Sequence, residues 1–524
     1  MLFNSFEFIF LFLPITLSVF FMLGRISSHR PALAWLVLCS LFFYGWWNPA
    51  YISLIIFSML FNYALGTILG RELRGAFRKY ILYFGILINL GLLGYYKYSN
   101  FFFEQINFVL DTSFNYEYVL LPLAISFFTF QQIAFLVDSY RNETKEYDFL
   151  QYCLFVTFFP QLIAGPIVHH KEMLPQFLLV DRFKINVKNI AIGLSIFSIG
   201  LFKKTVIADG ISPYSNVVFD SALSSDPITF FVAWGGALAY TIQLYFDFSG
   251  YSDMAIGLAR MFGIILPLNF YSPYKALNIS EFWRRWHITL SNFLRDYVYI
   301  ALGGNRKGSL ARFKNLFLTM FLGGLWHGAG WNFAIWGALH GFYLISNHAW
   351  VKYTSLWSIP IHESFKKFIA WGITFIAVVV GWVFFRATTF DAAITILQGM
   401  SGMNGISIPN GILVRLGPLQ EIFESMGITS HLGGGSDFMY TWLWIIIVLP
   451  LILILPNTQD LFYRVNGSLS NKNHENVLTF WPFYKKFSSF SWKENKTWAA
   501  VVSLALVFGL LTLSQVSEFL YFQF

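Results

Sequence analysis

Charged residues are scarce in this chain. Lys, Arg, Asp and Glu together make up 12% of its 524 residues, against roughly 25% in a typical soluble domain. The chain also has only two cysteines, Cys39 and Cys153, which lie in apolar surroundings without CxxC spacing. The low charge excludes an ordinary soluble enzyme, and the two cysteines indicate neither a disulfide framework nor a thiolate metal site.

Common catalytic signatures are also missing. The sequence contains no HExxH motif, no Walker motif and no GxSxG nucleophile setting. The net charge is +8, but Lys and Arg are dispersed over short loops and form no basic face. We therefore expect no metal and no nucleic-acid partner, and we interpret the basic residues as topology signals that also meet anionic lipids.

The chain is rich instead in apolar and aromatic residues, at 56% and 20% of the total. Several apolar runs approach the roughly 20 residues that a helix needs to cross a bilayer. Such runs begin at Phe8, Tyr80, Phe368, Thr441 and Trp498. These features predict an all-α polytopic membrane protein with about a dozen spanning and re-entrant helices, folded as a single domain over residues 1–524.

Loop charges predict how the chain is oriented in the membrane. Residues 1–8 carry no Lys or Arg, so we expect an uncleaved first helix whose N-terminus lies outside. Basic and neutral or acidic loops then alternate as the positive-inside rule requires. The polar connection 402–437 and the C-terminal tail are predicted outside. The loops predicted inside are 25–30, 71–79, 141–145, 306–314 and 457–496.

The centre of the chain, residues 158–341, is denser in Gly, Pro, Asn, Arg and His than plain spanning helices are. Non-helical backbone at membrane depth is tolerated only where protein buries it or where it lines a wet cavity. We therefore predict that 158–177, with a break at Gly165-Pro166, and 266–274 are re-entrant or broken elements around a cavity. The substrate is expected there.

Two tryptophan-histidine pairs, Trp286-His287 and Trp326-His327, stand among apolar residues in this central part. The thirteen helical residues from Lys314 to His327 rise about 20 Å, roughly two thirds of a 30 Å hydrocarbon core. The glycines around His327 would let backbone or ligand approach its ring. We predict that His327 is a deeply placed proton-transfer residue, and the structural alternative is a histidine hydrogen-bonded between helices.

His287 is predicted to share a helical face with Arg284 and Ser291, because offsets of three and four residues place side chains on neighbouring positions. Such a cluster would bind an anionic group. The alternative is an interfacial segment in which Arg295 pairs with Asp296. The candidate substrate-binding residues are Arg284, Arg285, Asp296, Trp326 and Asn332.

Three other ionisable residues have open interpretations. On one ideal helix, His340 would point about 140° away from His327, which disfavours a shared metal site. Asp247 and Asp253 interrupt an apolar stretch. They are predicted either to orient a histidine or to pair with Arg260.

Six segments spread over nearly the whole chain form a specific set. They are MLFNSFEFIFLFLP at the start, residues 122–141, 158–167, 246–264 and 282–308, and GGLWHGAGWNFAIWGALHG. Together they resemble the membrane-bound O-acyltransferase family, in its bacterial branch of alginate O-acetylation, peptidoglycan O-acetylation and teichoic acid D-alanylation proteins. The LGGNRKG loop, the YFQF tail and the length favour the alginate acetylase-like subgroup.

The resemblance implies a helical bundle with a tunnel through the bacterial cytoplasmic (inner) membrane. It assigns catalysis to the histidine of the WHG motif, here His327, and matches the RWH histidine to His287. It also implies that the acetyl donor, acetyl-CoA, approaches from the cytoplasm without being a resident cofactor. The acceptor is a polysaccharide outside, reached through an extracytoplasmic SGNH-type partner.

We therefore interpret the chain as a membrane O-acetyltransferase in which His327 is the general base for an acceptor hydroxyl that attacks a thioester. His287 or Asp296 is expected to orient donor or acceptor. Two alternatives remain open from the residues alone. One is D-alanyl or other acyl transfer to a cell-envelope polymer, and the other is a transporter or flippase without chemistry, whose broken helices form a gated pathway.

Overall fold

The computed structural model describes residues 1–26, 28–70, 76–144, 148–224, 227–354, 362–465, 467–468, 490–513 and 520. The predicted inside residues Arg71, Arg74 and Lys145, most of the 457–496 loop and most of the C-terminal tail lie outside this part of the chain. The described residues are mostly helical with two short strands, which confirms the all-α class. The orientation of the chain relative to the membrane stays a prediction.

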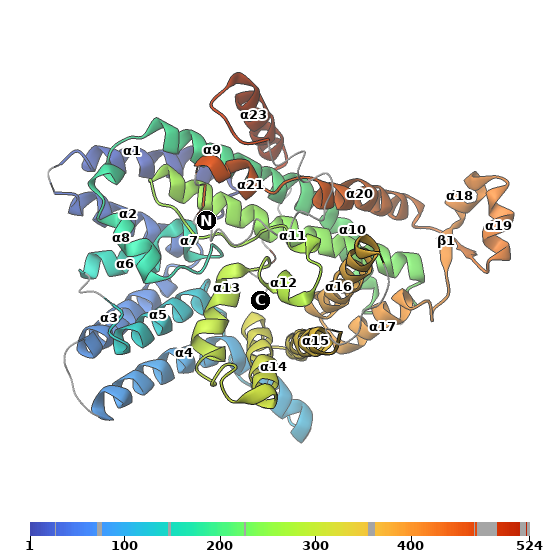
Figure 1. Ribbon diagram of the computed structural model, residues 1–524, viewed down its shortest axis with the longest axis horizontal. Helices are drawn as coiled ribbons and strands as arrows, with labels where there is room; N and C mark the ends of the chain where they lie inside the picture. Colours follow the sequence, from blue (N-terminus) through green and yellow to red (C-terminus); the bar gives the residue numbers. More distant parts are fainter. Residues whose placement is uncertain are drawn as a thin grey trace.

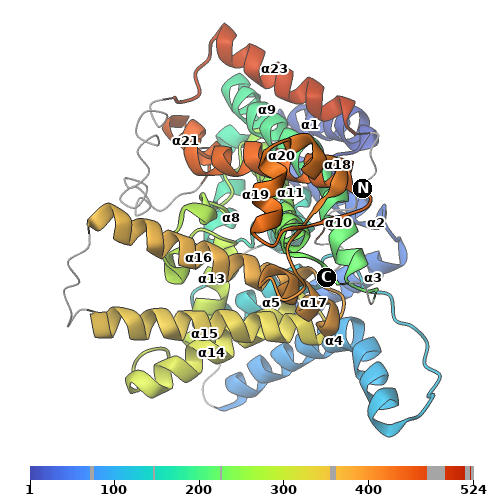
Figure 2. The same ribbon diagram turned by 90° about the vertical axis from the view of Figure 1, so that its right-hand side faces the viewer.

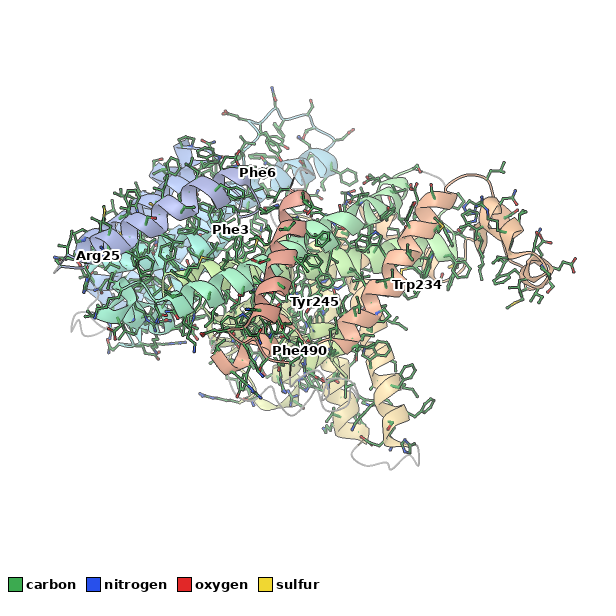
Figure 3. The ribbon with its side chains drawn as sticks, turned by 90° about the horizontal axis from the view of Figure 1, so that it is seen from above. Phe3, Phe6, Arg25, Trp234, Tyr245 and Phe490 are labelled. Atoms are coloured by element: carbon green, nitrogen blue, oxygen red, sulfur yellow. The ribbon has the colours of Figure 1, made fainter. Side chains whose placement is uncertain are left out.

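The N-terminal part forms a group of helices at one side of the molecule (Figure 1). Its elements are η1 (Phe8–Phe12), α1 (Leu13–Leu23), α2 (Arg30–Gly45), α3 (Ala50–Gly70), α4 (Ala76–Leu110), α5 (Ile125–Tyr140) and α6 (Phe149–Thr157). The first residues run inward, because Phe3 is fully buried and its ring stacks 4.7 Å from that of Tyr251. Figure 3 shows Phe3 in the interior and Arg25 at the edge.

The middle of the molecule is organised around one long helix, α11 (Phe230–Met261), which is buried along most of its length. The elements before it are α7 (Phe159–Leu162), α8 (His170–Phe177), η2 (Val180–Phe183), α9 (Val187–Phe202), η3 (Lys203–Ala208) and α10 (Asp209–Ser221). Helix α9 packs closely on α11. A Cβ atom at Gly193 would lie 2.5 Å from the carbonyl oxygen of Gly257, so small residues bring the two backbones into contact.

The elements that carry the two tryptophan-histidine pairs follow α11. They are η4 (Pro273–Lys275), α12 (Ile279–Trp283), α13 (Ile288–Phe293), η5 (Leu294–Tyr299), α14 (Gly308–His327), α15 (Trp331–Thr354), α16 (Glu363–Arg386) and α17 (Phe390–Met400). Figure 2 shows α14 and α15 side by side, with α4 next to them. This arrangement brings segments more than two hundred residues apart into contact.

The remaining elements include a small extension and three further helices. The extension projects from one end of the molecule (Figure 1) and contains β1 (Ser407–Pro409), α18 (Asn410–Leu413), η6 (Val414–Leu416), α19 (Leu419–Ser425) and β2 (Thr429–His431), with β1 and β2 paired in parallel. Beyond it lie α20 (Gly435–Ile454), α21 (Thr458–Phe462), η7 (Tyr463–Val465) and α23 (Lys496–Leu511).

Length and composition identify the segments that can span a membrane. Five helical stretches qualify in the described part of the chain, namely Ala50–Gly70, Ala76–Leu110, Val187–Ser221, Glu363–Arg386 and Gly435–Val465. Three shorter apolar helices, Phe8–Leu23, Arg30–Gly45 and Lys496–Leu511, accompany them. The protein is therefore a multi-pass membrane protein.

Both predicted interruptions are present. Gly165 and Pro166 lie in non-helical chain between α7 and α8, and residues 266–272 are non-helical between α11 and η4. Nearly all residues of these two segments are buried, as irregular backbone inside a membrane protein must be. Both segments lie against the elements that hold the candidate site.

Candidate active site

His327 is the last residue of α14 and is buried. Aromatic rings surround its imidazole, with ring centroids 5.0 Å away for Trp326 and Trp336 and 5.2 Å away for Phe385. The predicted depth of His327 in the membrane stays a prediction. The apolar rings exclude water from the imidazole, so a reaction there would take place in a dry environment.

The glycines around His327 serve helix packing. A Cβ atom at Gly324 would lie 2.3 Å from the backbone oxygen of Phe333, and one at Gly328 would lie 2.1 Å from the Phe333 ring. These glycines let α15 turn back tightly onto α14. The sequence left open whether backbone or ligand approaches at these glycines, and at Gly324 it is backbone that does so.

His287 lies in the turn between α12 and α13. Its backbone has a φ of 42°, in the left-handed region, which is uncommon for a residue other than glycine and costs free energy. The predicted helical face shared by Arg284, His287 and Ser291 is therefore wrong. The helix is interrupted between Trp283 and Ile288, and the offsets of an ideal helix do not apply across the break.

A buried amide holds the His287 imidazole. The Oδ1 atom of Asn269 lies 3.1 Å from Nδ1 of His287 and accepts hydrogen bonds from the backbone N–H and the hydroxyl of Thr289. Because an amide oxygen only accepts, Nδ1 of His287 carries the proton and the lone pair of the neutral ring is on Nε2. The Thr289 hydroxyl in turn accepts from the N–H of Ile167 in the first helix interruption.

The two tryptophan-histidine pairs converge in space. The Trp326 ring lies 6.2 Å from the His287 ring and 5.0 Å from the His327 ring, so one tryptophan is close to both imidazoles. His340 also belongs to this group, because its ring lies 4.8 Å from that of Trp336, which contacts His327. The prediction that His340 points away is wrong, since α14 ends at His327 and α15 starts afresh at Trp331.

Lys97 of α4 completes the group and was missed by the sequence reasoning. Its ammonium donates to the backbone oxygens of Trp326 and His327, at 2.5 Å and 3.1 Å. Its side chain is almost fully buried. The available signal was a single lysine within a long apolar run. The backbone oxygens it binds lie 229 and 230 residues further along the chain.

Two cavities are lined by residues of this group or by their neighbours in the chain. A cavity of about 650 Å³ is lined by Ile288 and Thr289, which directly follow His287, and by Ile167, His169, Asp296 and Tyr297. A much smaller one, of about 30 Å³, is lined by Lys97, Ser126, Trp326 and His327. His327 thus lines the small cavity, and His287 directly precedes two residues that line the large one.

A third cavity gathers cationic side chains. Its volume is about 510 Å³, and its lining includes Arg284, Arg295, Arg312 and His348. Arg295 also lines the large cavity, so the two are neighbours. The predicted pair between Arg295 and Asp296 is present, with Nε 2.7 Å from the carboxylate. We call this third space the arginine cavity.

Two predicted substrate-binding residues are engaged within the protein. Arg285 is buried, forms a 2.8 Å salt bridge with Glu281 and donates to the backbone oxygen of Tyr271. Asn332 donates to the backbone oxygen of Ala387 at 2.7 Å, which ties α15 to the end of α16. Both side chains support the site walls, and neither lines the three cavities described above.

The two aspartates of α11 have lysine partners. Asp247 lies 2.6 Å from the ammonium of Lys204, and Asp253 lies 2.7 Å from that of Lys203. Arg260 donates to a backbone oxygen instead. Both predicted roles, orienting a histidine and pairing with Arg260, are therefore wrong, because η3 packs its lysines against this part of α11.

One further polar cluster borders the large cavity. The Oδ2 atom of Asp138 lies 2.6 Å from His169, 3.1 Å from His170 and 2.8 Å from the hydroxyl of Tyr297. Asp138, His169 and His170 each offer one potential metal-ligand atom, and these atoms lie within 4.8 Å of one another. This is the one group of that kind among the described residues. Direct hydrogen bonds account for all these contacts, so the cluster forms a polar wall without requiring an ion.

Comparison with known proteins gives a consistent result. A model of the membrane-bound O-acyltransferase family matches residues 96–390, which contain Lys97, His287, His327 and His340. The peptidoglycan O-acetyltransferase of Helicobacter pylori is 47% identical over 435 residues, covering 78% of this chain and 81% of that protein. The probable alginate O-acetylase AlgI of Pseudomonas putida is 42% identical over 402 residues, covering 75% and 79%. The teichoic acid D-alanyltransferase of Bacillus subtilis is 27% identical over 279 residues, covering 51% and 69%.

Proposed function

Because this chain belongs to the membrane-bound O-acyltransferase family and is a membrane acyltransferase, we propose that it moves an acetyl group from a cytoplasmic thioester to an extracytoplasmic polysaccharide. The location proposed is the bacterial inner membrane. The observation that supports this function best is the pair of buried histidines, of which His327 lines a small cavity and His287 directly precedes two residues that line a large one. A transporter without chemistry is set aside, since the family is one of enzymes.

In the proposed reaction His327 is the general base. As the acceptor oxygen forms its bond to the acetyl carbonyl carbon, the hydroxyl proton passes to the His327 imidazole and the carbon–sulfur bond breaks. The proton then passes to the leaving thiolate, so the histidine is regenerated. Positioned acid-base help of this kind typically contributes about 10² to 10⁴ in rate. His287, whose lone pair is fixed on Nε2 by Asn269, orients the reacting groups.

The donor proposed is acetyl-CoA. The arginine cavity offers Arg284, Arg295 and Arg312 for its phosphates, because guanidinium groups bind phosphate by paired hydrogen bonds. Arg295 is shared with the large cavity, which leads toward His287. The thioester arm would therefore extend from the arginine cavity through the large cavity to the histidines.

The acceptor proposed is a cell-envelope polysaccharide, reached through an extracytoplasmic partner of the SGNH type. Relatives at 42–47% identity are named for acetylation of peptidoglycan or alginate, whereas the D-alanyl relative is 27% identical. This difference favours acetyl over D-alanyl transfer. The described chain contributes no serine hydrolase setting of its own, so the partner would supply the final step.

The test is acetyl transfer by the purified full chain in nanodiscs with radiolabelled acetyl-CoA, the partner and polysaccharide. His327→Ala should abolish labelling of the polymer, while His362→Ala, an exposed cap residue of α16, should leave it unchanged. A D-alanyl carrier protein offered in place of acetyl-CoA should give no transfer. Equal labelling by the wild type and His327→Ala would refute the role of His327, and preference for D-alanyl would refute the donor.

A further inference from the structure

The C-terminal end of α14 is capped from another helix. The last carbonyl groups of an α-helix lack donors within the helix, and the interior of a membrane offers no water in their place. Two consecutive residues of α4 supply the donors. Tyr98 donates its hydroxyl to the backbone oxygen of Leu325 at 2.5 Å, and Lys97 donates to the oxygens of Trp326 and His327.

Lys97 is the charged member of this cap. It lies within the candidate span Ala76–Leu110, and its ammonium is 3.5 Å from the Ser126 hydroxyl and 5.8 Å from the centre of the Trp326 ring. Among the salt bridges of the described residues none involves Lys97. The negative end of the α14 dipole is therefore the principal partner of its charge. A buried ion with backbone partners at a proposed catalytic turn indicates a functional role.

We infer that Lys97 is a positioning residue for acyl transfer, which holds the final turn of α14 so that the His327 imidazole faces the reacting groups. This inference rests on the proposed function of His327. The backbone oxygen of His327 itself accepts from Lys97, so the contact acts on the residue that performs the proton transfer. Tyr98 supports the same turn through Leu325, one step further from the imidazole.

Substitutions can separate the hydrogen bonding of the Lys97 side chain from its packing. Methionine resembles lysine in length and apolar body but has no N–H donors. In Lys97→Met the oxygens of Trp326 and His327 would lose their donors, while most apolar contacts of the side chain stay. Arginine keeps the charge and the donors on a bulkier head, so Lys97→Arg should restore part of the function.

The first measurement is steady-state kinetics of acetyl transfer by the full chain in nanodiscs. Lys97→Met should lower kcat by at least about tenfold with little change in KM for acetyl-CoA, since misplacing a catalytic group by about 1 Å can cost about 10²-fold. Lys97→Arg should recover part of this loss. The matched control is Lys79→Met on the same helix, where the ammonium lies 5.4 Å from the Tyr83 ring. Equal kcat values for Lys97→Met and Lys79→Met would overturn the inference.

A second measurement does not depend on turnover. Diethyl pyrocarbonate modification of His327, followed by mass spectrometry, should be faster in Lys97→Met than in the wild type, because the last turn of α14 is released. An unchanged rate of His327 modification would overturn the positioning role. This readout holds even if the wild type fails to use acetyl-CoA, a result that would refute the proposed function and not the positioning role. If Lys97→Met does not fold, Tyr98→Phe decides, because it removes a donor to the same turn. Wild-type kinetics and modification in Tyr98→Phe would count against the inference.

Discussion

Replacing Asn269 with leucine should release His287 from its fixed orientation. One amide oxygen of Asn269 serves three donors, namely Nδ1 of His287 and the backbone N–H and hydroxyl of Thr289. Leucine has a similar volume and no acceptor. Each lost hydrogen bond costs about 1 kcal/mol, so the turn should lose roughly 3 kcal/mol in total. The left-handed backbone of His287 adds strain that the amide no longer offsets.

This loss has a local and a catalytic consequence. A change of roughly 3 kcal/mol corresponds to about 10²-fold more frequent opening of the turn, which hydrogen exchange of the amides at residues 287–291 measures directly. Acetyl transfer should fall by a similar factor of about 10² in kcat, since His287 no longer presents one defined nitrogen. Asn269→Asp, which keeps an acceptor at this position, should lose less protection.

The control is Asn410→Leu, because Asn410 is exposed at the start of α18 in the projecting extension. This variant should match the wild type in exchange and in transfer. Unchanged exchange at 287–291 in Asn269→Leu would refute the claim that this amide holds the turn. Lost protection with normal transfer would show that the orientation of His287 is irrelevant to the reaction.

Three further predictions concern the surrounding framework. Gly324→Ala should impair folding, because its Cβ would lie 2.3 Å from the Phe333 backbone, and size-exclusion chromatography should show a loss of monodisperse protein. Gly330→Ala should be tolerated, since the nearest atom to its Cβ lies 3.6 Å away. Lys204→Met should lower the thermal midpoint, since it removes the lysine partner of two buried carboxylates at a cost of about 3–5 kcal/mol. An unchanged midpoint would contradict the buried ion cluster. Arg284→Ala should raise KM for acetyl-CoA more than it lowers kcat, whereas Arg285→Ala should mainly lower stability. The opposite result for the two variants would mean that Arg285 binds the donor and Arg284 supports the fold.

Helices and helix interruptions could be predicted from the sequence, because they depend on composition and on the rise per residue of a helix. The helix that runs from the basic loop to His327 follows from the apolar run in between, and the interruptions around Gly165-Pro166 and 266–274 follow from residues that break helices. The prediction for His340 failed because it assumed one helix through residues 327–340. Gly328 and Gly330 in the WHGAGW segment were a signal for the turn between α14 and α15.

Other features depend on contacts that no local pattern contains. His287 adopts a left-handed backbone without being glycine, so the break that separates it from Arg284 has no sequence signal of its own. Asp247 and Lys97 both have partners on helices that are distant in the sequence. Asp247 pairs with the Lys204 side chain, whereas Lys97 donates to the backbone oxygen of Trp326. Such pairs are decided by how α4, α11 and their neighbours pack, which local pattern reasoning does not give.

The positions of the two histidines explain how this site works without a cluster of acidic residues. His327 ends one helix and His287 precedes another, so both lie where the backbone has polar groups without helical partners. Lys97 and Tyr98 donate to the carbonyl groups on one side, and Asn269 accepts from the N–H groups of Ile288 and Thr289 on the other. Helix ends that are satisfied in this way supply rigid polar contacts inside an apolar bundle. The imidazoles can therefore be oriented by backbone and amide groups, and a buried carboxylate with its large desolvation cost is not needed beside them.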